Sequence, residues 1–390
     1  MEFTKEYKNA VMTGKGINSL FRCIFQSEKG TPFWIIYNTV GQHWIFPQSH
    51  TKRFLSLFQP SSMKGKVVSK ILPYLRFMPF IASKINAQAI TISLHSSIEK
   101  AICKSFGITD FEYGVFCGSP GRHQKITIMI NQGKKCLGYC KVTDNPEVFA
   151  IFQKESADLL YLKTKGVSCI PEILFVNEIK DLPGVFLLVQ TTKREGIVRT
   201  AAINDSYIFD FVVRMHNLTK NKMSYAESDF AQSVHVLKSY IDLFKAEEKY
   251  AILHAISGVE KELSNLFYYS AYHGDFTPWN CYIVDKELFV FDFEYFQRHT
   301  IPYLDYFHFF TQSCIYNKYM EADSIFEEYL KNRELIHIKI DNVDFYYTCY
   351  LLNIMSFYLE RDKGFLNERI ESCFKIWIKL IRLINYEFSA

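Results

Sequence analysis

The chain has 390 residues, enough for two or three domains, and its hydrophobic content of 48% provides for a substantial core. A formal net charge of +4 is small for this length and no recognised nucleic-acid-binding motif is present, so nucleic acid is not expected as a partner. The charged N-terminus lacks the apolar stretch of a secretory signal, and no run of 18 uncharged apolar residues occurs, which predicts a cytoplasmic protein without a membrane-spanning helix.

Residues 1–105 are predicted to form an N-terminal accessory segment with short strands at 21–25, 33–37 and 43–46. Residues 63–80 differ, because apolar positions alternate with four basic residues, Lys64, Lys66, Lys70 and Arg76, and Pro73 would kink a continuous helix. A basic amphipathic segment of this kind can lie on an anionic membrane, here at its inner face. It can equally pack against the next domain with its lysines in water, since amphipathicity marks only a helix with one buried face.

Residues 106–191 are predicted to form a small β-rich lobe. Alternating apolar residues and intervening turns indicate strands at 111–116, 125–130, 136–142, 170–177 and 185–190. The turn between the first two strands contains Gly118, Ser119 and Gly121, and Lys141 falls near the end of the third.

A helix is predicted over 147–165, with Pro146 at its start and Gly166 as its stop. Glu155 lies about two turns into this helix. Strand lysines and helix glutamates are usually solvated surface charges, so neither Lys141 nor Glu155 indicates a site by itself.

Residues 192–390 are predicted to form a helical lobe. Apolar residues at intervals of three and four indicate helices within 208–218, 230–267, 307–329 and 345–388. The ten cysteines show no metal-binding or C-x-x-C spacing and are expected as reduced thiols, with Cys136 and Cys140 on one face of their strand.

The most informative stretch is residues 273–280, which read His-Gly-Asp-Phe-Thr-Pro-Trp-Asn, followed by Asp292. Phosphoryl transfer needs a carboxylate at the attacking hydroxyl and oxygen ligands for Mg²⁺ that bridge the phosphates. Asp275 can supply the carboxylate, while Asn280 and Asp292 can supply metal ligands. Two short apolar runs separated by the turn at 285–287 predict a hairpin that returns Asp292 to the loop.

At these residues the chain resembles the aminoglycoside phosphotransferase and choline kinase group, small-molecule relatives of protein kinases. Their catalytic loop reads His-Gly-Asp-x-x-x-x-Asn and is followed by a hairpin ending in Asp-x-Glu or Asp-x-Asp. The resemblance implies an α+β, protein-kinase-like fold of two lobes, with Asp275 as catalytic base and Asn280 and Asp292 as Mg²⁺ ligands. It also implies that His273 braces the loop and that Asp305 begins a helix that steadies it, although an ordinary N-cap gives the same signal at Asp305.

The same resemblance implies the ATP site of the β-rich lobe. Lys141 would hold the α- and β-phosphates and pair with Glu155, the turn at Gly118, Ser119 and Gly121 would cover the phosphates, and adenine would lie along 187–191.

The predicted function is therefore an ATP- and Mg²⁺-dependent kinase acting on a hydroxyl group of a small molecule, such as a sugar, an amino alcohol or a surface-polysaccharide intermediate. A catalytically silent kinase-fold binding or scaffold protein is the alternative, since a fold can persist when its chemistry does not.

Overall fold

The computed structural model describes residues 15–38, 41–58, 63–118, 121, 123–194, 198–337 and 340–387. The fold is α+β, and the chain divides into two compact units, Met1–Tyr161 with Cys169–Val198, and Leu162–Ser168 with Arg199–Ala390. In the parts of the chain just given, no helix is both long and apolar enough to cross a membrane.

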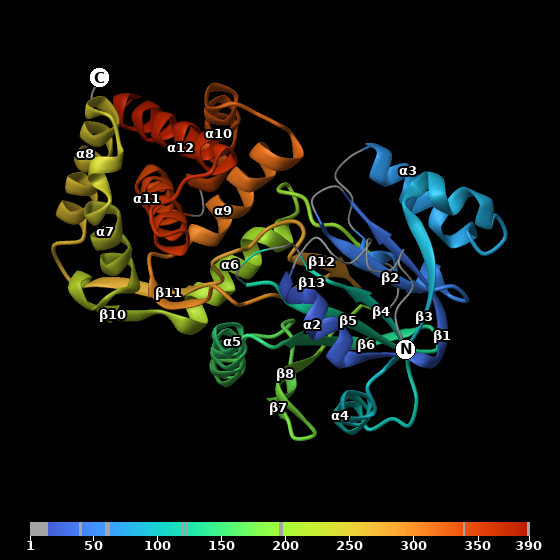
Figure 1. Cartoon of the computed structure of the whole chain (residues 1–390). Coiled ribbons are helices and arrows are strands. Elements are labelled where there is room, and N and C mark those ends of the chain that lie inside the picture. Colours follow the sequence, from blue (N-terminus) through green and yellow to red (C-terminus); the bar gives the residue numbers. More distant parts are fainter. Residues whose placement is uncertain are drawn as a thin grey trace. The chain divides into compact units, whose positions relative to one another are not determined.

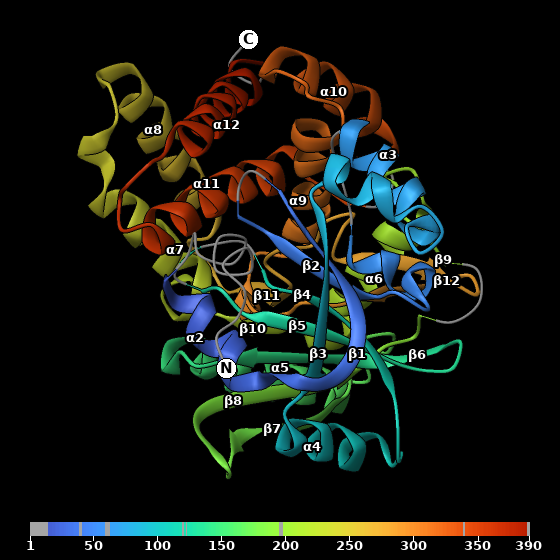
Figure 2. The ribbon, with the colours of Figure 1, turned by 45° about the vertical axis from the view of Figure 1, so that its right-hand side comes forward.

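The first unit is built on one eight-stranded sheet, whose order is β3-β1-β2-β4-β5-β6-β8-β7 (Figures 1 and 2). Its strands are β1 (Phe25–Tyr37), β2 (His43–Pro47), β3 (Ala87–Leu94), β4 (Glu112–Phe116), β5 (Ile126–Gln132), β6 (Lys135–Thr143), β7 (Ile173–Ile179) and β8 (Leu182–Thr191). Its helices are α2 (Lys15–Ile24), α3 (Met63–Ile71), α4 (Ser96–Phe106) and α5 (Pro146–Thr164), with 3-10 turns at Thr51–Leu57, Leu72–Tyr74 and Pro79–Ile85.

The boundary predicted at residue 105 does not separate compact units. Strands β1 to β3 precede it and extend the sheet, since β2 pairs with β4 through Trp44 and Phe116. The five strands predicted for the small β-rich lobe are present as β4 to β8, all antiparallel to their neighbours.

Both faces of the sheet are covered. Alternate residues of β1 enter different apolar clusters: Phe33 and Ile35 join one with α2 and α4, and Trp34 and Ile36 join another with Phe54, Leu72 and Leu75. Residues 51–58 and 63–85 therefore pack against the sheet, as one of the two interpretations of the basic segment predicted, and α3 ends before Pro73.

The strand predicted at 21–25 was wrong, because residues 21–24 end α2 and only Phe25 belongs to a strand, as the first residue of β1. Leu20, Phe21 and Ile24 are buried at helical spacing, whereas a strand would bury alternate residues. Strand β3 and helix α4 were not predicted.

The second unit is largely helical. Its helices are α6 (Ser206–Thr219), α7 (Asp229–Ser239), α8 (Ala246–Glu262), α9 (Leu304–Gln312), α10 (Ala322–His337), α11 (Val343–Arg361) and α12 (Glu368–Glu387). Two three-stranded sheets, β10-β11-β14 and β13-β12-β9, contain β9 (Val198–Arg199), β10 (Asn221–Met223), β11 (Phe267–Tyr272), β12 (Cys281–Val284), β13 (Glu287–Val290) and β14 (Gln297–Thr300). Residues 273–280 connect β11 to β12, so the predicted loop lies between two strands.

Candidate active site

The loop at 273–280 needs a glycine at its second position. Gly274 has φ +87°, and a Cβ there would lie 2.3 Å from the carbonyl oxygen of Tyr295. Only glycine fits such a backbone without strain. Two residues further on, the fully buried Phe276 packs against Phe211 and Phe309, which fixes the loop to the helical core.

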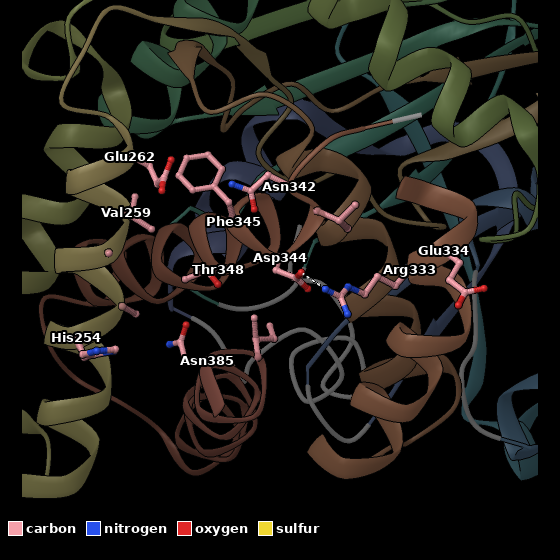
Figure 3. Close-up of a pocket in the computed structure, with 14 residues that line it drawn as sticks. His254, Val259, Glu262, Arg333, Glu334, Asn342, Asp344, Phe345, Thr348 and Asn385 are labelled. Carbon is pink, nitrogen blue, oxygen red and sulfur yellow. Dashed lines mark hydrogen bonds and ion pairs between the residues drawn. The ribbon is translucent and has the colours of Figure 1, made fainter. Parts of the chain in front are cut away.

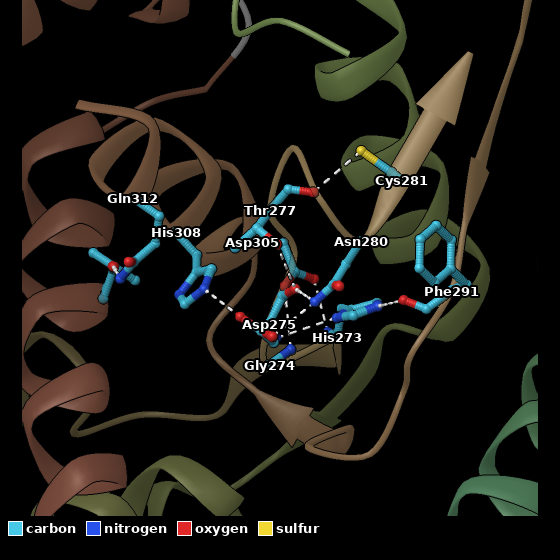
Figure 4. A network of polar contacts seen from close by, with 11 residues as sticks. His273, Gly274, Asp275, Thr277, Asn280, Cys281, Phe291, Asp305, His308 and Gln312 are labelled. Atoms are coloured by element: carbon cyan, nitrogen blue, oxygen red, sulfur yellow. Dashed lines mark hydrogen bonds and ion pairs between the residues drawn. The ribbon is translucent and has the colours of Figure 1, made fainter. Parts of the chain in front are cut away.

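His273 is a structural brace, as predicted. Its Nε2 donates to the carbonyl oxygen of Phe291 at 3.0 Å, and its Nδ1 accepts from the backbone N–H of Asp275 at 3.2 Å (Figure 4). Burial lowers the pKa of His273 to about 4, against the opposing field of Asp275. A neutral imidazole is what these two contacts require, since one nitrogen donates and the other accepts.

The Asp275 carboxylate is held on both of its oxygens while its side chain remains 33% exposed. Oδ2 accepts from Asn280 Nδ2 at 2.7 Å, and Oδ1 contacts His308 Nε2 at 3.3 Å. The carboxylate is therefore oriented by buried groups and still open on one side, which is the arrangement required of a base that must meet a hydroxyl.

Asn280 and Asp292 are brought together by the predicted hairpin. Strands β12 and β13 pair in register, and Asp285 and Lys286 both have positive φ, as a two-residue turn of type I′ requires. The N–H of Phe291 donates to the Asn280 carbonyl oxygen at 3.0 Å. Asp292 therefore directly follows Phe291, the residue whose backbone is hydrogen-bonded to Asn280.

These two residues fit a hard divalent cation. Asn280 Nδ2 donates to both the backbone oxygen and the carboxylate of Asp275, so the amide oxygen is the atom left to face a ligand. The Asp292 carboxylate is a second oxygen donor of the same kind, and Mg²⁺ is commonly held by one or two such groups plus phosphate oxygens. No cluster of three His, Cys, Asp or Glu suited to a metal occurs among the residues for which the structure gives positions.

Asp305 fastens the loop backbone to α9. It is fully buried, and it accepts from the N–H of His273 at 2.8 Å and of Gly274 at 3.4 Å. Tyr303 occupies the N-cap of α9, so Asp305 is not an ordinary N-cap. Burial raises the pKa of Asp305 to about 7, although the two N–H donors act in the opposite direction.

The residue that sequence reasoning missed is His308. It lies one helical turn after Asp305 on α9 and its side chain is 3% exposed. Its ring packs edge-on against Tyr350, and its Nδ1 has no hydrogen-bond partner among the described residues. The sequence carried no signal for it, because it stands inside an apolar helix 33 residues after Asp275.

In the β-rich unit, Lys141 and Glu155 form an ion pair. Lys141 Nζ lies 3.0 and 2.9 Å from the two carboxylate oxygens of Glu155, and both side chains are buried. Strand β6 supplies the lysine and α5 supplies the glutamate, so the register assumed for the helix is the one observed.

The predicted phosphate-covering turn joins β4 to β5. Gly118 has φ +69°, and a Cβ there would lie 2.6 Å from the carbonyl oxygen of Lys125, so the turn requires glycine at this position. Gly121 has nothing within 4 Å of such a Cβ. Ser119 lies outside the described residues.

A cavity of about 630 Å³ lies in the helical unit (Figure 3). Its lining includes His254, Glu262 and Thr348, together with the ion pair of Arg333 and Asp344 at 2.6 Å. None of the residues predicted from the sequence lines this cavity.

No protein-family model matches the chain, and no curated protein matches it. Several solved structures are similar to this chain. An amicoumacin kinase is 16% identical, with 70% of this chain and 86% of that chain covered and a TM-score of 0.40. A thermostable mutant of the aminoglycoside phosphotransferase APH(4)-Ia, in complex with ADP and hygromycin B, is 10% identical, with 73% of this chain and 98% of that chain covered and a TM-score of 0.45.

A putative fructosamine-3-kinase from Haemophilus somnus is 13% identical, with 74% of this chain and 97% of that chain covered and a TM-score of 0.44. By their names these are small-molecule kinases, the class that the motif at 273–280 resembled. Since all three TM-scores are below 0.5, the function proposed for this chain depends on its own residues.

Proposed function

We propose that this chain is an ATP- and Mg²⁺-dependent phosphotransferase that transfers the γ-phosphoryl group of ATP to a hydroxyl group of a small molecule. The observation that carries the proposal is the Asp275 carboxylate, which is held on both oxygens by buried groups and open on its remaining side. Its loop is fixed through His273, Phe276 and Asp305, so the carboxylate has the preorganisation that phosphoryl transfer depends on.

In this mechanism Asp275 accepts the proton of the acceptor hydroxyl as the hydroxyl oxygen bonds to the γ-phosphorus. The bond between that phosphorus and its bridging oxygen breaks, and ADP leaves. The Asn280 amide oxygen and Asp292 carboxylate would hold Mg²⁺, which neutralises charge on the phosphates when bound.

Lys141 would position the α- and β-phosphates, and Glu155 would hold Lys141 in place. Burial favours this role over that of a surface ion pair, because a buried lysine and glutamate are costly to desolvate and rarely occur without a function or a full set of partners. The Gly118 turn would cover the phosphates.

The charge of the large-lobe helices supports one class of acceptor over another. A cationic aminoglycoside would need a dense acidic surface, and the helices of the large lobe carry no dense acidic cluster in their sequence. A neutral or anionic acceptor, such as a sugar or a surface-polysaccharide intermediate, is therefore favoured.

The decisive experiment is a screen for acceptor-stimulated ADP formation from Mg²⁺-ATP across sugars, amino alcohols and aminoglycosides, with Asp275→Asn as the matched variant. The parent chain should form ADP and phosphorylated acceptor. The variant should bind ATP nearly as well but turn over about 10² to 10⁴ times more slowly, the range of a positioned general base. Thermal stabilisation by ATP that needs no Mg²⁺, with no ADP formed by either protein, would instead establish a silent nucleotide-binding module.

A further inference from the structure

The segment 63–84 exposes an unusual set of side chains. Its outer face consists of five large apolar residues, Met63, Val67, Tyr74, Phe77 and Phe80, which are 76, 52, 58, 76 and 72% exposed. Five basic residues, Lys64, Lys66, Lys70, Arg76 and Lys84, are exposed among them. We call these ten residues the basic-apolar face.

Folding does not require the apolar half of this face. Val68, Leu72, Leu75 and Ala82 already bury the inner side of the segment against the sheet of the first unit. Large apolar side chains gathered on a surface mark an interaction site, whereas scattered ones need no explanation.

The charge around the face has one sign. No Asp or Glu occurs in the 70 residues from Lys29 to Ile98, which contain eight Lys and Arg. Removing those eight from the 45 in the chain leaves 37 Lys and Arg against 41 Asp and Glu, so the positive balance of the whole chain resides in this stretch. None of the five basic residues of the face forms an ion pair with any described residue, and Arg76 lies 6.0 Å from the Phe77 ring centre.

We propose that the basic-apolar face binds an anionic lipid surface. The apolar side chains would enter the boundary between headgroups and acyl chains, while the basic side chains remain at the lipid phosphates. A nucleic acid explains the face less well, because Met63 and Val67 have no ring on which a base can stack. A second copy of the chain explains it less well too, because two such faces would bring like charges together.

Vesicle sedimentation tests the proposal with the full chain. Binding to phosphatidylcholine vesicles containing phosphatidylglycerol should be strong at low salt, weaker at high salt, and small for phosphatidylcholine alone. Each basic residue near such a surface contributes about fivefold to binding, from roughly 1 kcal/mol apiece. Lys64→Glu, Lys66→Glu and Lys70→Glu together should therefore weaken binding by more than about 100-fold.

The matched control reverses three exposed lysines elsewhere, Lys134, Lys222 and Lys261, and so makes the same change in net charge. It should bind vesicles like the parent chain. Phe77→Ser with Phe80→Ser should weaken binding at high salt, where the charge contribution is screened, and should leave the melting temperature unchanged because both rings are exposed.

Equal losses in the two charge-reversed proteins would overturn the proposal, since general charge would then suffice. So would vesicle binding that is unaffected by either set of face variants, binding to single-stranded DNA without binding to vesicles, or a lipid-free dimer that the double serine variant abolishes. None of these readouts depends on turnover, so failure here would leave the phosphotransferase assignment untouched.

Discussion

Replacing His308 should impair turnover without impairing nucleotide binding or folding. His308 Nε2 lies 3.3 Å from Asp275 Oδ1, on the carboxylate oxygen that Asn280 does not hold. In His308→Leu the carboxylate loses one of its two buried donors and gains freedom to rotate. In His308→Gln the amide nitrogen can reach the place of Nε2 and keep a donor there.

The magnitude follows from the contact. A hydrogen bond to a charged group is worth about 1.5–3 kcal/mol, and at 3.3 Å this one is longer than the usual charge-assisted range, so the lower value applies. About 1.5 kcal/mol corresponds to roughly a tenfold fall in kcat for His308→Leu. His308→Gln should stay within about threefold of the parent. The stability of the leucine variant should change little, because it also removes a buried Nδ1 that no described residue satisfies.

The assay is ADP formation at saturating ATP and acceptor, or ATP hydrolysis with water in place of the acceptor, with KM for ATP and the urea unfolding midpoint measured alongside. In an Asp275→Asn background the leucine effect should disappear, since His308 would act only through that carboxylate. Equal kcat in the leucine and glutamine variants, or an undiminished leucine effect in the Asp275→Asn background, would refute the positioning role.

Further expectations concern the other site residues. Lys141→Met and Glu155→Gln should each weaken ATP binding and lower the free energy of unfolding by about 3–5 kcal/mol. The double variant should resemble the worse single variant; losses of ATP affinity that multiply in a nucleotide titration would show that the two residues act independently. Asp292→Ala should raise the Mg²⁺ concentration needed for half-maximal activity, and an unchanged Mg²⁺ titration would remove it from the metal site. Because its folded pKa is raised to about 7, Asp305 should contribute stability that is present below pH 4 and lost as the pH rises through 7, so Asp305→Asn should flatten that decline in urea unfolding across pH 4–7. Gly274→Ala should cost at least 1–3 kcal/mol through its positive φ and the contact with Tyr295, whereas an unchanged unfolding midpoint would show that the loop can rearrange.

The sequence patterns correctly predicted the elements that depend on residues close together in the chain. The hairpin after the loop, the strands around Gly118 and the helix carrying Glu155 each follow from residues adjacent in sequence, and each was located within a few residues of its observed bounds. The predictions at 21–25 and 230–267 were less successful. Two or three apolar residues in a short run fit a strand as well as a helix end. Leu263 and Leu266 continue the three- and four-residue spacing of α8, and this hid the change from α8 to β11.

The faces to which the side chains of β6 point could not be predicted by counting alternating positions. Cys136 and Cys140 were expected on one face of β6, yet they enter apolar clusters on opposite faces of the sheet. The pairing of β5 with β6 shifts between Ile130 and Asn131, and a shift of one residue transfers every later side chain to the other face.

At the candidate site too, residues far apart in the sequence determine the geometry. Asp305 and His308 are three residues apart, so they share one face of α9, and that face meets the loop twice: Asp305 holds the backbone of 273–274 and His308 contacts the Asp275 carboxylate. Every residue of α9 is buried, so the helix has no freedom to shift while the core is intact. The orientation of the Asp275 carboxylate is therefore set by a helix some 30 residues later in the chain. A sequence motif can identify this carboxylate, but it does not identify the distant residues that orient it.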